Sequence, residues 1–439
     1  MPGIQRAPKK EIFGWAMFDF ANSAYTTVIV TVVFSVIFPK FIVGDEKTGN
    51  LLWSISISVA NLIVAMSAPV LGAIMDFGAR KKQFLFASYI FTVVTTMALY
   101  FAGPGDVAIA MIAVIASFVG FALGEAFVAS FLPGLAPPEE FGKISGYAWG
   151  LGYFGGLIST AIVMFGLGPQ TIENFDNLRL VGPITGLFFL VSAIPTFMWL
   201  KERGTPRDLP PGETVFSITI GRLAKTFREI QDFRDLAMLL ISFFFGYAGL
   251  SIVISFAFIY GDQVVKWDAG VQVLMFIITQ ITAAGGAILF GVIQDRLGAK
   301  KTFILTLLLW ILAVVLISGT NTISAAINSM LGVNWEAQYF FLFVGSLAGL
   351  GLGATQSACR AMVGLFSPES KSAEFFGFWG LTNRIATIFG LMSLGLLQSI
   401  FNLEIAILIC AVLFFASAVI ALLIDEGRGR ASATRHEGE

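Results

Sequence analysis

The stretch GAIMDFGARKK at residues 72–82 lies between two long apolar runs, and a related stretch, GVIQDRLGAKK, lies in the same setting at residues 291–301. Each copy contains a glycine, an aspartate and a group of cations in a short hinge. A charged hinge between two apolar runs is typical of consecutive membrane-spanning helices joined at the bilayer surface. The repetition indicates that the chain consists of two similar halves.

The composition favours a membrane protein. Of the 439 residues, 56% are hydrophobic and 13% are charged, whereas soluble domains carry about 25% charged residues. The formal net charge of -1 gives no electrostatic basis for a nucleic-acid partner. We therefore expect an all-α integral membrane protein.

Apolar stretches of about 20 residues, the length that crosses a bilayer as a helix, recur about twelve times. The predicted spans are residues 12–39, 52–76, 83–102, 107–132, 144–167, 182–202, 236–261, 269–294, 302–320, 337–362, 374–399 and 404–424.

A polar insertion divides these spans into two groups. We predict an N-terminal six-helix bundle at 1–202, a linker at 203–235, a C-terminal six-helix bundle at 236–424 and a polar tail at 425–439. Apolar residues recur at helical spacing in the linker and predict an amphipathic helix on the membrane surface or under the bundle. These residues are Phe216, Ile220, Leu223, Phe227 and Ile230.

The distribution of Lys and Arg over the loops predicts the orientation of the chain in the membrane. Most of the 27 Lys and Arg residues lie on the termini and on alternate hinges, while the opposite loops carry Lys40, Lys47, Arg179 and Lys266. Loops rich in Lys and Arg remain cytoplasmic. We expect a multi-pass protein with both termini in the cytoplasm, in a bacterial inner membrane.

The chain lacks the residues that most catalytic and metal sites need. Cys359 and Cys410 lie in separate apolar spans, and the one histidine, His436, lies in the tail. They give no basis for a disulfide framework, a zinc site or a histidine proton relay, and the sequence has no glycine-rich ATP-binding loop. We expect no enzyme activity, no cofactor and no metal, so that any transport would be secondary.

A second pair of matching segments supports the repeat. The segments that begin at Pro138 and Pro368 share a Pro-Glu start and a later Trp-Gly-Leu sequence. Tandem six-helix repeats are the architecture of major facilitator transporters, in which the substrate site lies between the repeats. The two hinges resemble the loop motif of that superfamily, which latches the halves together on the cytoplasmic face. The resemblance implies a gating role for Gly72, Asp76, Arg80, Gly291, Asp295 and Arg296; a topology signal alone is the alternative.

The first hinge allows a more detailed expectation. We expect Gly72 to permit a close approach of two helices, and Asp76 to face the N-terminus of a neighbouring helix. Phe77 stands where the motif usually has arginine. We therefore expect the first copy to form the weaker latch.

Three longer segments carry a closer resemblance. They are WAMFDFANSAY from Trp15, ISGYAWGLGYFGG from Ile144 and the segment Gly353–Leu381, and they resemble motifs of the vacuole-effluxer-like branch of the superfamily. The namesake of that branch is a fungal vacuolar exporter of amino acids. The resemblance implies a major facilitator fold of twelve transmembrane helices in two six-helix repeats and transport by alternating access.

Apart from charged residues at the very ends of the predicted spans, Glu404 among them, four charged residues lie inside the spans: Asp19, Glu125, Arg360 and Arg384. A charge near the bilayer centre costs about 2.5–3.5 kcal/mol and therefore needs a partner, water or a function. Two carboxylates in one half and two arginines in the other suggest ion pairs that form when the cytoplasmic side is closed and separate when it opens. The alternatives are recognition of a zwitterionic solute, proton coupling through a carboxylate, permanent structural pairs and, for Asp19 and Arg360, snorkelling to the interface.

Polar and aromatic neighbours extend the candidate site. Asn22 follows Asp19 by about one helical turn, and Gln356 precedes Arg360 by four residues on the same helical face. Tyr153 and Tyr247 are candidates for lining a cavity, although aromatic residues in spans also serve packing.

The leading hypothesis is a secondary transporter of a small organic solute, with an amino acid as the first choice. The alternatives are an exporter of amphipathic molecules such as drugs or lysolipids, and a membrane sensor or enzyme that does not transport. As partners we expect a small-molecule substrate and the lipid bilayer, with proton coupling left open, no nucleic acid, and a monomeric protein.

Overall fold

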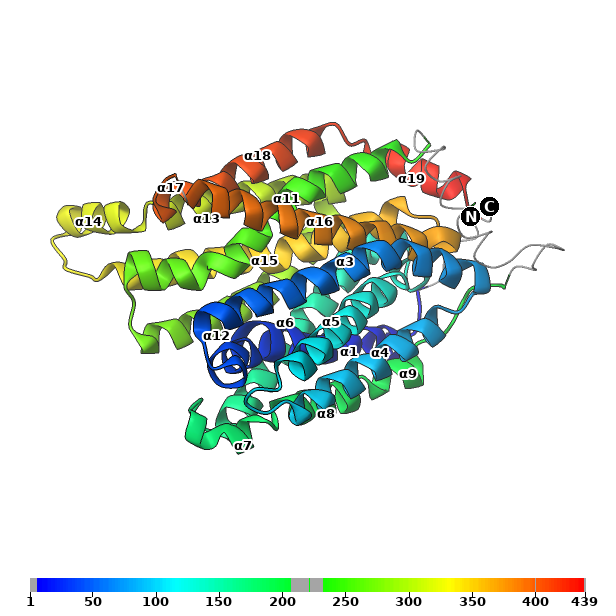
Figure 1. The fold of residues 1–439 in the computed structure, drawn as a ribbon. Helices are drawn as coiled ribbons and strands as arrows, with labels where there is room; N and C mark the ends of the chain where they lie inside the picture. Colours follow the sequence, from blue (N-terminus) through cyan, green and yellow to red (C-terminus); the bar gives the residue numbers. More distant parts are fainter. Residues whose placement is uncertain (1–5, 207–220, 222–231, 399, 438–439) are drawn as a thin grey trace.

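The computed structural model describes residues 6–206, 221, 232–398 and 400–437, which form one elongated bundle of helices (Figure 1). In this part of the chain, twelve helices or continuous helical runs are long and apolar enough to cross a membrane. The prediction of an all-α membrane protein with twelve spans in two six-helix repeats is confirmed. The amphipathic run predicted for the linker lies outside the described residues.

The first half contains the helices that precede the linker. Its α-helices are α1 (Lys9–Ala24), α2 (Phe34–Ile37), α3 (Glu46–Gly78), α4 (Lys81–Met97), α5 (Val107–Ala129), α6 (Phe141–Leu167), α7 (Phe175–Leu178), α8 (Val181–Ser192) and α9 (Ile194–Trp199). The π-helical segments η1 (Tyr25–Val32) and η2 (Phe38–Val43) continue α1 and α2, so that the first span runs from Lys9 to Val43.

The second half follows the linker. Its α-helices are α11 (Arg234–Tyr260), α12 (Ala269–Leu297), α13 (Ala299–Ser318), α14 (Thr320–Leu331), α15 (Ala337–Phe366), α16 (Ser372–Gln398), α17 (Leu403–Ala406), α18 (Ile409–Leu422) and α19 (Glu426–Arg435). The sequence did not predict α14, which extends beyond the bundle at one end, or α19, which forms within the predicted polar tail (Figure 1).

One end of the bundle carries both hinges, the beginning of α1 and the end of α19 (Figure 1). We call it the basic end, because Arg80, Lys81 and Lys82 lie in the first hinge and Lys300 and Lys301 in the second. Helix α14 lies at the opposite end.

The halves meet along two helix crossings that the repeat relates to each other. Helix α3 packs against α16 (Figure 1), and a Cβ atom at Gly72 would lie 2.2 Å from the carbonyl oxygen of Ala373. Helix α12 packs against α6, and a Cβ atom at Gly291 would lie 2.4 Å from the carbonyl oxygen of Gly142. Only glycine allows the backbones to touch in this way.

In each half, a bidentate ion pair at the basic end joins the first helix to the segment that follows the last. Arg203, after α9, donates to both carboxylate oxygens of Glu11 in α1 at 2.6 and 2.8 Å. Arg428, after α18, donates to both carboxylate oxygens of Asp235 in α11 at 2.6 and 2.8 Å.

The same repetition holds at the start of the third span of each half. The backbone N–H of Lys82 in α4 donates to Glu202 at 2.7 Å, and that of Lys300 in α13 donates to Glu426 at 3.1 Å. These matched contacts show that the two halves share a structural plan beyond their helix order.

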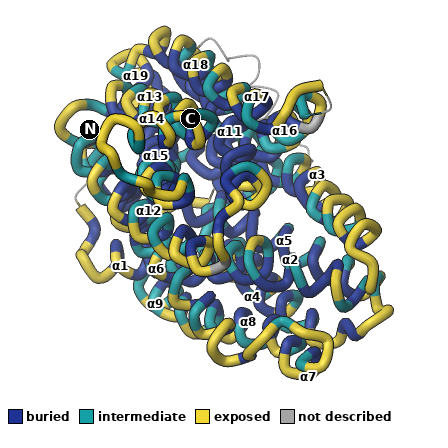
Figure 2. The backbone as a smooth tube through the Cα atoms, turned by 90° about the vertical axis from the view of Figure 1, so that its left-hand side faces the viewer, coloured by how far each residue is buried: buried dark blue, intermediate teal, exposed yellow. Residues whose placement is uncertain are grey.

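Large apolar side chains cover the outer surface. Phe165 is 90% exposed, Met66 71% and Ile112 68%, and exposed residues lie mostly at the periphery of the bundle in Figure 2. Such a surface is suited to contact with lipid.

Candidate functional site

The first intramembrane ion pair joins α1 of the first half to α15 of the second. Arg360 donates from one terminal nitrogen to Asp19 at 2.5 Å. Its Nε donates to the hydroxyl of Ser145 at 3.0 Å, and its other terminal nitrogen donates to the carbonyl oxygen of Ser145 at 2.9 Å. Each guanidinium nitrogen therefore has an acceptor, and all three acceptors belong to the opposite half.

Two tryptophans enclose the same guanidinium. Its carbon lies 4.8 Å from the ring centroid of Trp15 and 5.3 Å from that of Trp149, within the range of cation–π attraction. The indole N–H of Trp15 donates to the carbonyl oxygen of Val128 at 2.7 Å, which fixes the ring. Arg360 is 2% exposed, so this pair is tightly held while the halves remain together.

The second ion pair, between α5 and α16, has looser geometry. Arg384 lies 3.3 Å from Glu125 and donates to the side-chain oxygen of Asn61 at 3.4 Å. Charge-assisted hydrogen bonds of good geometry are about 2.7–2.9 Å long. The Glu125 side chain is 24% exposed, against 12% for Asp19, so Glu125 is the more accessible of the two carboxylates.

Polar atoms beside this pair have unused hydrogen-bonding capacity. Within the described part of the chain, the buried Nε of Arg384 and the buried side-chain oxygen of the adjacent Asn383 have no hydrogen-bond partner. Buried polar groups are normally satisfied, and exceptions often mark places where water or a ligand binds. Arg384 lies near the middle of α16, and Asn61 near the middle of α3.

The remaining predicted residues lie near these pairs. The hydroxyl of Tyr153 in α6 donates to the side-chain oxygen of Gln356 in α15, which adds a further polar contact between the halves. Asn22 is buried, and its side-chain oxygen has no partner among the described residues. Tyr247 in α11 is half-buried, and its ring packs 5.2 Å from that of Phe243.

The first hinge forms an extensive contact with the opposite half at the basic end. Asp76 accepts from the backbone N–H of Glu374 at 2.8 Å, in the first turn of α16, and lies 3.2 Å from the ammonium of Lys81. Lys81 also donates to the hydroxyl of Ser372 at 2.5 Å and to the carbonyl oxygen of Glu369 at 3.3 Å. The carboxylate at a helix N-terminus and the cation beside it stabilise each other.

The second hinge repeats the arrangement with fewer contacts. Asp295 accepts from the backbone N–H of Lys143 at 3.0 Å, in the first turn of α6. The first hinge thus makes more contacts with the opposite half than the second, because Lys81 supplies a cation where Phe77 does not; which copy forms the weaker latch stays a prediction. Arg80 and Arg296 are exposed, whereas Gly72 and Gly291 lie at the helix crossings described above.

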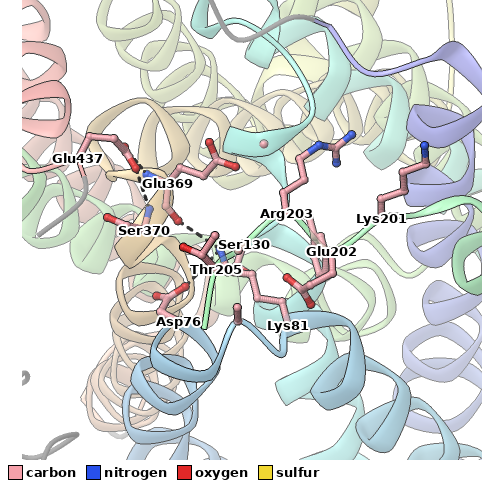
Figure 3. Close-up of a pocket in the computed structure, with 14 residues that line it drawn as sticks. Asp76, Lys81, Ser130, Lys201, Glu202, Arg203, Thr205, Glu369, Ser370 and Glu437 are labelled. Atoms are coloured by element: carbon pink, nitrogen blue, oxygen red, sulfur yellow. Dashed lines mark hydrogen bonds and ion pairs between the residues drawn. The ribbon is translucent and has the colours of Figure 1, made fainter. Parts of the chain in front are cut away.

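A cavity of about 300 Å³ lies beside Asp76 and Lys81 of the first hinge, at the basic end. Figure 3 shows Asp76 and Lys81 on one side of it and Glu369 and Glu437 on another, with Arg203 across from them. The cavity therefore lies between side chains of the two halves.

Sequence reasoning missed the surroundings of Arg360. Ser145 and Trp15 both lie within the quoted motifs, but a serine and a tryptophan in apolar spans carry no signal of an arginine partner. The pairs that close each half were also missed, although Glu11 and Asp235 stand at matching places in the first span of each half. Aligning the two halves against each other would have matched these two carboxylates, but not shown their arginine partners.

Comparison with known proteins identifies the family. The family described as vacuole effluxer Atg22 like matches residues 41–434. The uncharacterized MFS-type transporter YxiO of Bacillus subtilis (strain 168) is 24% identical over 399 residues, which cover 88% of each protein. Autophagy-related protein 22-1 of Penicillium rubens is 27% identical over 304 residues, which cover 66% of this chain and 50% of the fungal protein. The chain thus spans about half the length of this fungal relative.

Solved structures agree on the fold. The structure of the major facilitator superfamily (MFS) proton:xylose symporter XylE superposes with a TM-score of 0.69 at 13% identity, over 93% of this chain and 94% of the symporter. With the family match over residues 41–434, the chain belongs to the vacuole effluxer Atg22-like family and is a multi-pass MFS-type secondary transporter.

Proposed function

We propose that this transporter moves an amino acid across a bacterial cell membrane by alternating access, with the basic end in the cytoplasm. The positive-inside rule supports this orientation, because the cation-rich hinges and both described ends of the chain lie at the basic end. In this orientation the structure corresponds to a state closed toward the cytoplasm.

The observation that carries the proposal is the contrast between the two intramembrane ion pairs. Each connects a carboxylate of the first half to an arginine of the second, so each must separate or lengthen when the halves part. In Asp19–Arg360 every guanidinium nitrogen has an acceptor, and this pair is suited to a gate. Glu125–Arg384 is long and incompletely satisfied and is suited to a solute.

A zwitterionic solute matches the charges of the second pair. Arg384 offers nitrogen donors to a carboxylate, and guanidinium groups bind carboxylates well because two N–H groups can act together. Glu125 offers an acceptor to an ammonium group. Tyr153, Gln356 and Tyr247 border the same region from α6, α15 and α11. Proton coupling would add a second task for Glu125, since a carboxylate released from its arginine in an apolar setting takes up a proton more readily.

Uptake into proteoliposomes tests the proposal. A labelled amino-acid mixture is supplied with and without a pH gradient, and the parent protein is compared with Glu125→Gln and Arg384→Gln. Glu46→Gln is the matched control, because it removes a carboxylate that is 68% exposed and only loosely paired with Lys40 at 3.7 Å.

We expect transport in the parent and the control and its loss in both site variants. If Glu125→Gln instead keeps transport that no longer depends on the gradient, Glu125 couples protons and does not bind the solute. If the folded parent moves amphipathic molecules and no amino acid, the substrate assignment is wrong. If Glu125→Gln and Arg384→Gln transport as the parent does, the site assignment is wrong.

A further inference from the structure

The segment 425–437 docks firmly on the second half at the basic end. Besides the bidentate pair with Arg428, Asp235 accepts from the backbone N–H of Asp425 at 2.8 Å. The hydroxyl of Ser432 donates to the carbonyl oxygen of Asp232. The ring of His436 packs 4.8 Å from that of Phe233. The fold therefore holds this segment in a defined place.

Glu437, the last described residue, contacts the turn Glu369–Ser372, to which Lys81 of the first hinge also binds. The carboxylate of Glu437 accepts from the backbone N–H groups of Glu369 and Ser370 at 2.8 and 3.1 Å. Lys81 of the first half binds the same turn through the carbonyl oxygen of Glu369 and the hydroxyl of Ser372. The turn is thus bound by the tail segment on its N–H side and by the opposite half on its carbonyl side.

The cavity of Figure 3 places the tail carboxylate opposite cations of the first half. Of the described residues that line it, the first half supplies Lys81, Lys201 and Arg203 together with Asp76 and Glu202, and the second half supplies the carboxylates of Glu369 and Glu437. The second-half side carries carboxylates alone, whereas the first-half side has three cations and two carboxylates, with Lys81 bound to Asp76 and Arg203 bound to Glu11, so the difference in charge between the sides is small. The attraction between the tail carboxylate and these cations exists only while the halves are together at this end.

A second contact of the tail segment crosses between the halves with the charges reversed. Arg430 in α19 lies 3.8 Å from Glu139, which precedes α6. Both side chains are partly exposed, so this pair contributes little by itself. It adds a second point at which the tail segment contacts the first half.

We propose that segment 425–437 is a built-in strap that stabilises the state closed at the basic end. It positions the turn Glu369–Ser372 for Lys81 and adds attraction between the halves, and its release shifts the equilibrium toward opening of the basic end. The inference rests on the proposed function only in requiring two states; it does not depend on the substrate.

Distance measurements between spin labels test the strap. Gln83→Cys in α4 and Lys301→Cys in α13 place labels on exposed positions of the two halves at the basic end, and Cys359 and Cys410 are buried. The labelled full chain in lipid is compared with Glu437→Ala, Glu437→Lys and a chain that ends at Arg435. Arg435→Gln is the control, because Arg435 is exposed in the same segment.

A carboxylate that accepts from N–H groups at the start of a helix, as Glu437 does, is expected to change the ratio of closed to open protein roughly two- to fivefold. We expect the closed population to fall by that factor in Glu437→Ala and in the shortened chain, by more in Glu437→Lys, and to stay unchanged in Arg435→Gln. Gly72→Ala, which acts at the helix crossing itself, is included to show that the labels report opening. If it opens the basic end and the tail variants do not, the strap is refuted while the two-state transporter stands. If neither changes the distances, both proposals are refuted.

Discussion

Replacing Gly72 by alanine places a methyl group between the two halves at the point where their backbones touch. The added Cβ atom would lie 2.2 Å from the carbonyl oxygen of Ala373, 2.7 Å from its carbonyl carbon and 3.1 Å from the Cα atom of Glu374. Ordinary contact begins at 3.4 Å, so α3 and α16 must separate by about 1.2 Å, the difference between 3.4 and 2.2 Å.

This separation also acts on the latch. Asp76 lies one helical turn from Gly72 on α3 and accepts from the backbone N–H of Glu374 at 2.8 Å. A comparable lengthening would take that distance beyond the roughly 3.2 Å limit of a hydrogen bond. Insertion of a methyl group into a close-packed contact costs about 1–3 kcal/mol. Because each 1.4 kcal/mol is a factor of ten, the equilibrium should shift roughly 5- to 150-fold toward opening of the basic end.

The assay is the distance distribution between labels at Gln83→Cys and Lys301→Cys in lipid. Two glycine controls separate opening from general damage. A Cβ atom at Gly285 in α12 meets no atom within 4 Å, so Gly285→Ala should leave both the distances and the stability unchanged. A Cβ atom at Gly155 would lie 2.0 Å from the carbonyl oxygen of Phe20 within the first half, so Gly155→Ala should lower stability without favouring the open state.

A Gly72→Ala protein that is folded and keeps the parental distance distribution would refute the reasoning. So would a Gly155→Ala protein that opens the basic end as much as Gly72→Ala does, because the effect would then follow from loosened packing and not from contact between the halves.

Further predictions concern the buried ion pairs and use thermal unfolding of the purified protein. Arg360→Gln leaves Asp19 buried without a cation and should cost about 3–5 kcal/mol; Arg360→Lys should recover only part of this loss, because one ammonium cannot replace the guanidinium contacts to both Asp19 and Ser145. An unchanged unfolding midpoint in Arg360→Gln would contradict the buried pair. Glu11→Gln and Asp235→Asn should each lower the midpoint by a similar, smaller amount, since each weakens the arginine pair that closes one half; a marked loss in one variant and none in the other would contradict the matched roles.

The sequence predicts the spans well because hydrocarbon leaves the backbone little choice. An apolar run of sufficient length must satisfy its N–H and C=O groups internally, and a helix does so. The repeated hinge likewise predicts two related halves. The short helix α19 could not be predicted in this way, because it is stabilised by its docking on Asp235 and Phe366 and not by an apolar pattern of its own.

The sequence predicts the charged residues of the candidate site but not which carboxylate pairs with which arginine. The free-energy cost of a charge inside the membrane is enough to identify the residues that need partners, which are Asp19, Glu125, Arg360 and Arg384. Which carboxylate lies beside which arginine depends on the depth and rotation of each helix, and a single sequence does not encode these as a pattern. The same holds for Ser145, whose contact with Arg360 arises only from the packing of α6 against α15.

The unequal geometry of the two pairs was also beyond sequence reasoning. Arg360 is enclosed by two indole rings and bound on all three nitrogens, whereas Arg384 lies beside a partly accessible carboxylate with its Nε unpartnered among the described residues. The assignment of one pair to gating and the other to the solute depends on this difference.

The central claim is that the two halves open alternately at the two ends of the bundle. Its most direct test measures distances at both ends in one preparation, with Gln83→Cys and Lys301→Cys at the basic end and Asn50→Cys and Gln272→Cys, both exposed, at the opposite end. We predict that Gly72→Ala, or a transported amino acid, lengthens the distance at the basic end and shortens the distance at the other. Distances that change in the same direction at both ends, or at neither end, would contradict alternating access.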